Sequence, residues 1–238
     1  MHLRSVWALA ALLAGAACAA DAPFLMPEHS REFVVGAALV YQDEEEGSAR
    51  RSAFLRPHFE GEWSNGVFLQ GLWLGKQLST VPHLRYGPLL SFGRDRVSAH
   101  GGHGSPRPLV GAFWEYQVLH NLSIRARGHR MAGGGNGGLL DLQLASFNSV
   151  APHHALGLAA GLRLADRRYL QANFDAGKDA SGGVKDVYLK GVWLWELNPK
   201  YTASMTLESR RLEGSAATSP WVARRRSLAS SVMLTYRY

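Results

Sequence analysis

Apolar side chains occupy every second position in segment after segment of this chain. In "LVGAFWEYQV", for example, Val110, Ala112, Trp114 and Tyr116 alternate with smaller or polar residues. Successive side chains of a β-strand point to opposite faces, so a period of two indicates a strand with one apolar face. The repetition of this pattern predicts an all-β fold.

Eleven segments show the pattern clearly, and Tyr169–Phe174 is a candidate for a twelfth strand. The eleven are residues 32–41, 53–63, 67–75, 84–94, 109–118, 122–129, 138–147, 155–164, 185–197, 201–210 and 228–238. Short turns such as Asn198–Lys200 alternate with longer loops rich in glycine, charge or histidine. No break in composition divides residues 21–238, which predicts one domain.

A β-sandwich and a barrel both fit repeated strands. Small and charged residues on the polar faces, aromatic residues near strand ends, and short turns alternating with long loops are typical of outer-membrane barrels. We therefore expect a transmembrane antiparallel up-and-down β-barrel of twelve strands. Ten strands would remain if two segments belonged to loops, and a periplasmic sandwich is the soluble alternative.

Residues 1–20 have the layout of a secretory signal peptide. Arg4 precedes an apolar run, and small residues follow up to Ala20. Cleavage after Ala19 or Ala20 would remove Cys18, the only cysteine. A lipid anchor on Cys18 is the alternative, although Gly15 stands where lipoprotein signals usually have leucine. The prediction is an exported protein without disulfides.

The formal charge of the chain is +7, which suits acidic lipid headgroups or other polyanions. No zinc-knuckle, helix-turn-helix or RNP-like string is present, so we expect no nucleic-acid partner. Outer-membrane lipid and lipopolysaccharide are the expected surroundings of a monomeric barrel in the Gram-negative outer membrane.

The final strand carries alternating apolar residues up to the last position. We expect Leu228, Val232, Leu234, Tyr236 and Tyr238 to face lipid, and this strand to pair with the first because a sheet in lipid must close. Leu234, Tyr236 and Tyr238 would also form the signal that the barrel-assembly machinery recognises, by similarity to other barrels that end in an aromatic residue.

Several ordered stretches resemble the MipA/OmpV family of outer-membrane proteins. They are "VGAALVYQDEEEGSARR", "YGPLLSFGRDR", "GAFWEYQV", the segment from Gly182 to Val222, and "LTYRY". Ser215, Trp221 and Tyr238 depart from the residues usual in that family. The resemblance implies a scaffold between a lytic transglycosylase and a peptidoglycan synthase, or a role in envelope adaptation, and it brings no catalytic residues. A narrow channel for small solutes is the alternative function.

Other motifs do not support catalysis or a cofactor. The histidine pairs His100/His103 and His153/His154 lack a cysteine or an HExxH frame, and no GxSxG frame surrounds a serine. The glycine-rich stretch 131–138 lacks the end of a phosphate-binding loop. Asp43–Glu46 lacks the spacing of a calcium loop and is expected to be a solvated turn. We therefore expect no enzyme activity, no metal and no cofactor.

Two groups of charged residues remain. Arg224, Arg225 and Arg226 precede the last strand, where they would either contact lipopolysaccharide phosphates or form a hydrated basic loop. The second group lies on the polar faces of the predicted strands and would line the interior in pairs of opposite charge; its members are Arg56, His58, Glu60, Glu115, Arg125, Arg127, Asp141, Arg163 and Lys190.

Overall fold

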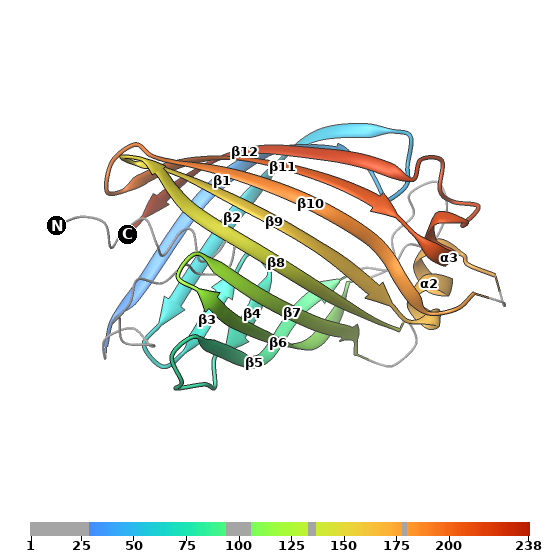
Figure 1. The fold of residues 1–238 in the computed structure, drawn as a ribbon, viewed down its shortest axis with the longest axis horizontal. Helices are drawn as coiled ribbons and strands as arrows, with labels where there is room; N and C mark the ends of the chain where they lie inside the picture. Colours follow the sequence, from blue (N-terminus) through green and yellow to red (C-terminus); the bar gives the residue numbers. More distant parts are fainter. Residues whose placement is uncertain (1–28, 94–105, 133–136, 178–179) are drawn as a thin grey trace.

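Twelve β-strands form one closed antiparallel barrel (Figure 1), in a computed structural model that describes residues 29–93, 106–132, 137–177 and 180–238. The strands are β1 (Arg31–Asp43), β2 (Arg51–Trp63), β3 (Val67–Gln70), β4 (Trp73–Lys76), β5 (Leu84–Gly93), β6 (Arg107–Leu119), β7 (Leu122–Met131), β8 (Gly138–Ala151), β9 (His154–Ala165), β10 (Gly183–Glu196), β11 (Tyr201–Leu212) and β12 (Arg226–Arg237). Each pairs with its neighbours in chain order, so the up-and-down barrel is confirmed.

The barrel closes between its first and last strands. β1 and β12 pair from Val34 opposite Arg237 to Tyr41 opposite Ser230. Beyond the strand itself, the Tyr238 amide donates to the Phe33 carbonyl over 2.9 Å. A Cβ on Gly36 would collide with the Leu234 carbonyl oxygen, so the two strands approach closely only because residue 36 is glycine. The predicted pairing of first and last strands is confirmed.

The two faces of the wall are inverted relative to a soluble protein. Leu39, Leu189 and Leu234 point outward and are half or more exposed, whereas Glu60 and Asp186 point inward and are buried. An apolar exterior around a charged interior is the arrangement expected of a barrel whose outer face contacts lipid.

The predicted lipid-facing side of β12 is also largely confirmed. Leu228, Val232, Leu234 and Tyr238 are exposed, whereas the Tyr236 ring is half-buried. Tyr236 is packed edge-on against Tyr201, at 5.1 Å between ring centroids, and against Tyr238, at 4.9 Å. Aromatic clusters of this kind at one rim are typical of the membrane interface.

The two rims differ in the length of their connections (Figure 1). One carries the short turns after β2, β6, β8 and β10 together with Tyr238. The other carries the longer connections, including helices α2 (Arg167–Phe174) and α3 (Gly214–Ala217). Since barrels have short periplasmic turns and long extracellular loops, the α2–α3 end is the extracellular end. Neither helix has the length and apolar composition that crossing a membrane would require.

The number of strands is the expected twelve, but one of the expected strands is a helix and another is a hairpin of two strands. Tyr169–Phe174 is not a strand but most of helix α2, which begins where the Asp166 carboxylate accepts from the Tyr169 amide over 2.7 Å. Residues 67–75, expected to be one strand, are instead the hairpin β3–β4, which turns at Gly71 with φ of +60°. Glycine adopts this left-handed conformation without strain.

Candidate functional site

The interior is lined by paired charges, as the alternation predicted. His58 lies 2.8 Å from Glu60, Arg125 lies 3.6 Å from Glu115, and Arg163 lies 3.1 Å from Asp141. Arg127 instead donates to the Gln70 side-chain oxygen over 3.1 Å. Arg56 and Lys190 form no ion pair with the part of the chain that the structure describes, so the expected pairing does not extend to them.

A denser group of ion pairs near the extracellular end was not foreseen. We call it the lumen charge network; its members are Glu46, Asp141, Arg163, Lys185, Asp186, Glu208 and Arg210. The Lys185 ammonium lies 2.7 Å from Glu46 and 2.9 Å from Asp186, and both Lys185 and Asp186 are almost completely buried. A buried charge is tolerated only when it is paired in this way.

A β-bulge explains why the alternation of the sequence did not predict that Lys185 and Asp186 both face inward. The register between β9 and β10 shifts between Val184 and Asp186, so Lys185 and Asp186 both point inward although they are consecutive. A strict alternation would have placed one of them outside. The only sequence signal was their place in the stretch that resembles the MipA/OmpV family.

Tyr188 links the network across β9. Its hydroxyl donates to Asp141 over 2.8 Å, and the Arg163 guanidinium lies 4.6 Å from the centre of its ring. A Cβ on Gly161 would lie 2.5 Å from the Tyr188 hydroxyl oxygen, so the ring crosses β9 at a position that must be small.

Three segments form an extracellular cap over the network: residues 44–50, α2, and residues 213–225. Leu170 and Phe174 of α2 are packed in an apolar cluster with Leu212 and Ala216. The first and third segments are joined by amides of Ala223 and Arg224, which donate to the Gly47 carbonyl. The cap therefore has its own small core and its own backbone hydrogen bonds.

Glu46 joins the cap to the barrel wall. Its carboxylate, 32% exposed, contacts Lys185 of β10 and accepts from Arg210 of β11 over 2.5 Å. Burial alone would raise the pKa of Glu46, but the two cations outweigh it and lower the pKa to about 2. The expectation that Asp43–Glu46 is only a solvated turn is therefore wrong for Glu46, because tertiary contacts supply cations that the local sequence lacks.

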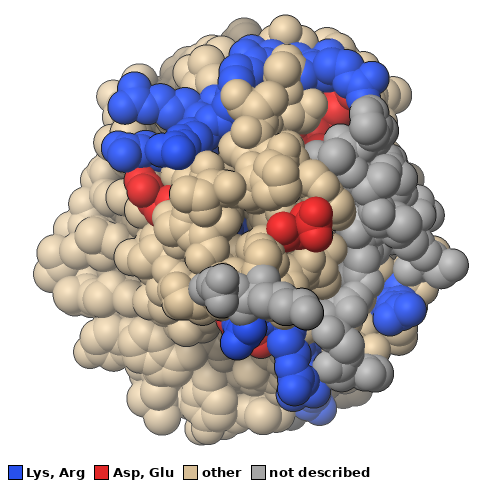
Figure 2. Space-filling model, turned by 90° about the vertical axis from the view of Figure 1, so that its right-hand side faces the viewer, with Lys and Arg blue, Asp and Glu red and all other residues tan. Residues whose placement is uncertain are grey.

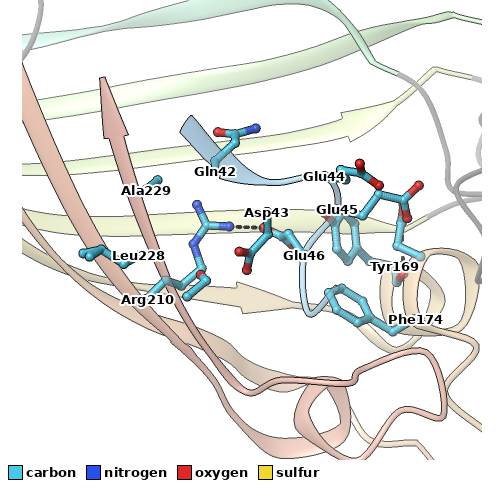
Figure 3. A pocket seen from close by; sticks show the side chains of 12 residues that line it. Gln42, Asp43, Glu44, Glu45, Glu46, Tyr169, Phe174, Arg210, Leu228 and Ala229 are labelled. Atoms are coloured by element: carbon cyan, nitrogen blue, oxygen red, sulfur yellow. Dashed lines mark hydrogen bonds and ion pairs between the residues drawn. The ribbon is translucent and has the colours of Figure 1, made fainter. Parts of the chain in front are cut away.

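A cavity of about 340 Å³ lies beside this contact. It is lined by Asp43 of β1, by Glu44 of the first cap segment, by Tyr169 and Phe174 of α2, and by Arg210, which Figure 3 shows between Glu46 and β12. Among the described residues, no group of three or more histidines, cysteines or carboxylates is arranged to bind a metal.

Side chains of the β3–β4 hairpin reach across one side of the interior. Gln70 beside its tip accepts from Arg127 of β7, and the ring of Trp73 lies 5.1 Å from that of His129 of β7. β5 and β6 separate β4 from β7 in the sheet, so these contacts span the lumen instead of following the wall. Side chains of the hairpin thus span part of the lumen, and the cap covers its extracellular end.

The three consecutive arginines lie at the extracellular rim and are exposed. Figure 2, which looks onto this end, shows Lys and Arg gathered along one edge. The Arg224 side chain donates to the Ala49 carbonyl and Arg225 Nε donates to the Ala217 carbonyl over 3.2 Å, whereas Arg226 begins β12. The cap therefore orients two of the three guanidinium groups.

The two histidines of the pair His153/His154 have different surroundings. His154 stacks on Trp193 and Trp195, and His153 turns the chain with φ of +64° and lies 3.6 Å from Glu196. His100 and His103 lie outside the described residues, as does part of the glycine-rich stretch 131–138.

The sequence profile described as MltA-interacting protein MipA matches residues 35–238. The chain belongs to the MipA family. The resemblance drawn from the sequence is thus confirmed, and the protein is an outer-membrane β-barrel. No match is found among curated proteins.

Solved structures similar to this MipA-family barrel include KdgM porin, with 11% identity and a TM-score of 0.49 over 85% of this chain and 98% of that one. An outer-membrane channel of Pseudomonas putida F1 has 14% identity and a TM-score of 0.46 over 92% and 100%. The translocator domain of the autotransporter NalP of Neisseria meningitidis has 9% identity and a TM-score of 0.45 over 89% and 90%.

Proposed function

We propose that this barrel is a non-enzymatic outer-membrane scaffold. It would hold a lytic transglycosylase, and through it a peptidoglycan synthase, at the periplasmic face of the membrane. The observation that carries the proposal is membership of a family described by its interaction with MltA over residues 35–238. The role requires an exposed surface and no catalytic residues.

The interior agrees with such a role. The lumen charge network and the contacts of the β3–β4 hairpin occupy space that an open pore would need. The periplasmic turns offer exposed polar groups instead, among them His120, His153 and Lys200. These turns are held on a rigid barrel, which favours a pre-organised docking surface.

A pull-down from detergent extract tests the scaffold. The purified barrel should capture a MltA-type transglycosylase, and the triple variant His120→Glu, His153→Glu, Lys200→Glu should capture at least about tenfold less, because three added carboxylates change the charge of the turns that would dock. Arg224→Gln at the opposite rim is the matched control and should bind normally. A folded wild-type barrel, verified by its heat-modifiable gel shift, that captures no transglycosylase would refute the proposal.

A narrow channel for small solutes is the second candidate. The observation in its favour is the charged, polar lining of the lumen, including Arg56 and Lys190. Planar bilayers separate the two functions, because steady single-channel steps from the wild-type protein require a continuous aqueous path. An insulating wild-type barrel that conducts only after Glu46→Gln would argue for a closed lumen and against a constitutive channel.

We further propose that Arg224, Arg225 and Arg226 contact lipopolysaccharide phosphates. Exposed guanidinium groups that are oriented by the cap can make charge-assisted hydrogen bonds to phosphate. Replacing all three by Gln should weaken lipopolysaccharide binding severalfold. Unchanged lipopolysaccharide binding together with an unchanged outer-membrane permeability barrier would contradict this contact.

A further inference from the structure

One sector of the lumen wall carries basic side chains without acidic partners. It runs from β10 through β11, β12 and β1 to β2, and every residue of these five strands is described. Lys190 of β10 is inward and half-buried, and Arg56 of β2 is inward and exposed. Neither side chain forms an ion pair with a residue of the five strands. A cation inside a barrel without a counter-charge is costly, so this sector is suited to a bound anion.

The carboxylate directly opposite Lys190 is already engaged. Glu208 of β11 faces Lys190 in the register, but it lies 2.7 Å from Arg210 and 3.6 Å from Arg163. Two other inward carboxylates are paired as well, Glu60 with His58 at 2.8 Å and Glu115 with Arg125 at 3.6 Å. The positive charges of Lys190 and Arg56 are therefore left in excess.

Lys190 and Arg56 lie within electrostatic reach of each other, although the register does not pair them. Direct pairing from Gly191, beside Lys190, leads across the sheet to Ala53 of β2 through Leu207, Ser230 and Tyr41. Because the strands of a barrel are tilted, directly paired residues of distant strands lie at different heights. The charge of Lys190 interacts instead with those of Arg56, Arg125 and Arg163.

Two hydroxyl groups lie on the wall between the two cations. Thr206 of β11 and Ser231 of β12 are directly opposite each other, and both are inward and half-buried. Neither hydroxyl forms a hydrogen bond with another side chain or backbone group in the described ranges. A hydroxyl can donate one hydrogen bond, so each has a donor available for a molecule in the lumen.

The lumen is hydrated at this level. The inward side chains of Arg125, Arg163 and Glu208 are still 15%, 16% and 18% exposed, so water-sized space lies beside them. Toward the periplasm, the next inward residues of β10 are Val192 and Leu194, which are buried. The hydrated space thus lies between the lumen charge network and an apolar layer.

We propose that this sector binds a small anion with carboxylate or phosphate oxygens. The Lys190 ammonium and the Arg56 guanidinium supply the positive charge, and the hydroxyls of Thr206 and Ser231 donate hydrogen bonds to the anion. The ligand supplies the negative charge that the wall lacks. The site is independent of the periplasmic scaffold proposed above.

NMR titration of the barrel in zwitterionic detergent micelles tests the site, at an ionic strength held constant with sodium chloride. Acetate or phosphate should shift the amide resonances of Lys190, Thr206 and Ser231 saturably, at least about tenfold more tightly than the uncharged acetamide. Tighter binding of phosphate than of acetate would assign a phosphate-bearing ligand, and the reverse a carboxylate. No saturable shift with either anion, or equal binding of acetamide, would overturn the site.

Two variants and a matched control test the residues. Lys190→Gln should weaken anion binding at least about tenfold, and Thr206→Val, which keeps the side-chain shape, about threefold. Lys200→Gln, at an exposed periplasmic turn, should bind like the wild type. Each barrel is first checked by its heat-modifiable gel shift, and Thr206→Val suffices if Lys190→Gln does not fold. Wild-type affinity in the folded variants would refute the assignment. Transglycosylase capture should be unaffected by Thr206→Val, so failure of the scaffold and failure of the anion site are visible separately.

Discussion

The wall from β8 through β12 to β1 and the wall from β2 to β5 are built in different ways. In the first, strands of 12–14 residues pair along nearly their whole length, except at the β1–β12 seam, where pairing stops at Tyr41 opposite Ser230. In the second, a hairpin of two four-residue strands separates β2 from β5, and among the described residues the first part of β2, residues 51–58, pairs with β1 alone. The long-stranded wall carries the lumen charge network, and the short-stranded wall is held by contacts across the lumen.

The difference shows where a membrane barrel can be interrupted. Backbone hydrogen bonds must be complete wherever the wall meets lipid, so an interruption needs prolines, water or a bound molecule at its edges. Pro57 of β2 satisfies part of that need in the short-stranded wall, whereas Pro88 lies within the part of β5 that pairs with the β4 side. We expect substitutions in the long-stranded wall to have larger effects on assembly and stability, and four comparisons test that expectation.

Deleting Tyr238 should have the largest effect, a severalfold loss of assembled barrel with export intact. The deletion removes the terminal aromatic residue and the hydrogen bond to Phe33 at the seam between β1 and β12. Heat-modifiable barrel in outer-membrane fractions is the measurement. Tyr238→Phe and Leu72→Asn, the latter at the tip of the β3–β4 hairpin, should both assemble normally. Normal insertion of the deletion variant would contradict the prediction that Leu234, Tyr236 and Tyr238 form the assembly signal.

Lys185→Met should cost about 3–5 kcal/mol in the free energy of unfolding, because it removes the cation that the buried Asp186 shares with the partly exposed Glu46. Arg85→Met in β5 should cost less, about 1–2 kcal/mol, because Arg85 is 4.0 Å from the partly exposed Glu62 and its other partner, the Gln77 side-chain oxygen at 2.8 Å, is uncharged. Urea unfolding in detergent micelles measures both. Equal costs would show that the two walls do not differ in their dependence on ion pairs.

Leu39→Arg and Leu55→Arg compare the walls at one depth, since the two residues lie opposite each other on β1 and β2 and both are exposed. Arginine on a lipid-facing position costs about 2–4 kcal/mol near the bilayer midplane. Leu55→Arg should cost less than half as much as Leu39→Arg, because Leu55 is the more exposed of the two and lies on the part of β2 that, among the described residues, pairs with β1 alone. An equal loss of unfolding free energy in bilayers would mean that the edge of β2 is dry.

The smallest effect is a dependence of stability on pH. Because the folded-state pKa of Glu46 is lowered to about 2, its ionised form stabilises the fold above the unfolded pKa, near 4.5. The difference in melting temperature between the wild type and Glu46→Gln should be constant from neutral pH to about pH 5 and should shrink as the pH falls toward 2. Glu44→Gln, which removes an exposed ion pair with Arg50, should change the melting temperature little. A difference in melting temperature that persists unchanged at pH 2 would contradict the ion pairs of Glu46 with Lys185 and Arg210.

The alternation of apolar and polar residues predicted most of the fold, because it depends only on which face of a strand each residue occupies. It identified the closing pairing of β12 with β1, the outward side of Leu228, Val232 and Leu234, and the interior pairs such as Arg163 with Asp141. It failed at Tyr169–Phe174, where Asp166 starts a helix through a hydrogen bond to the backbone. It also failed at Gly71, where one glycine with positive φ divides a strand into two.

The sequence by itself therefore determined that this chain forms a closed β-barrel with an apolar exterior, and its ordered motifs placed it in the MipA family. Only the tertiary structure decided that Glu46 reaches Lys185 and Arg210, which are separated from it by more than a hundred residues. The physical reason is that a period of two is a local property of the backbone. A bulge at Lys185, a cap over the lumen and an interrupted edge beside Pro57 depend instead on which distant strands become neighbours.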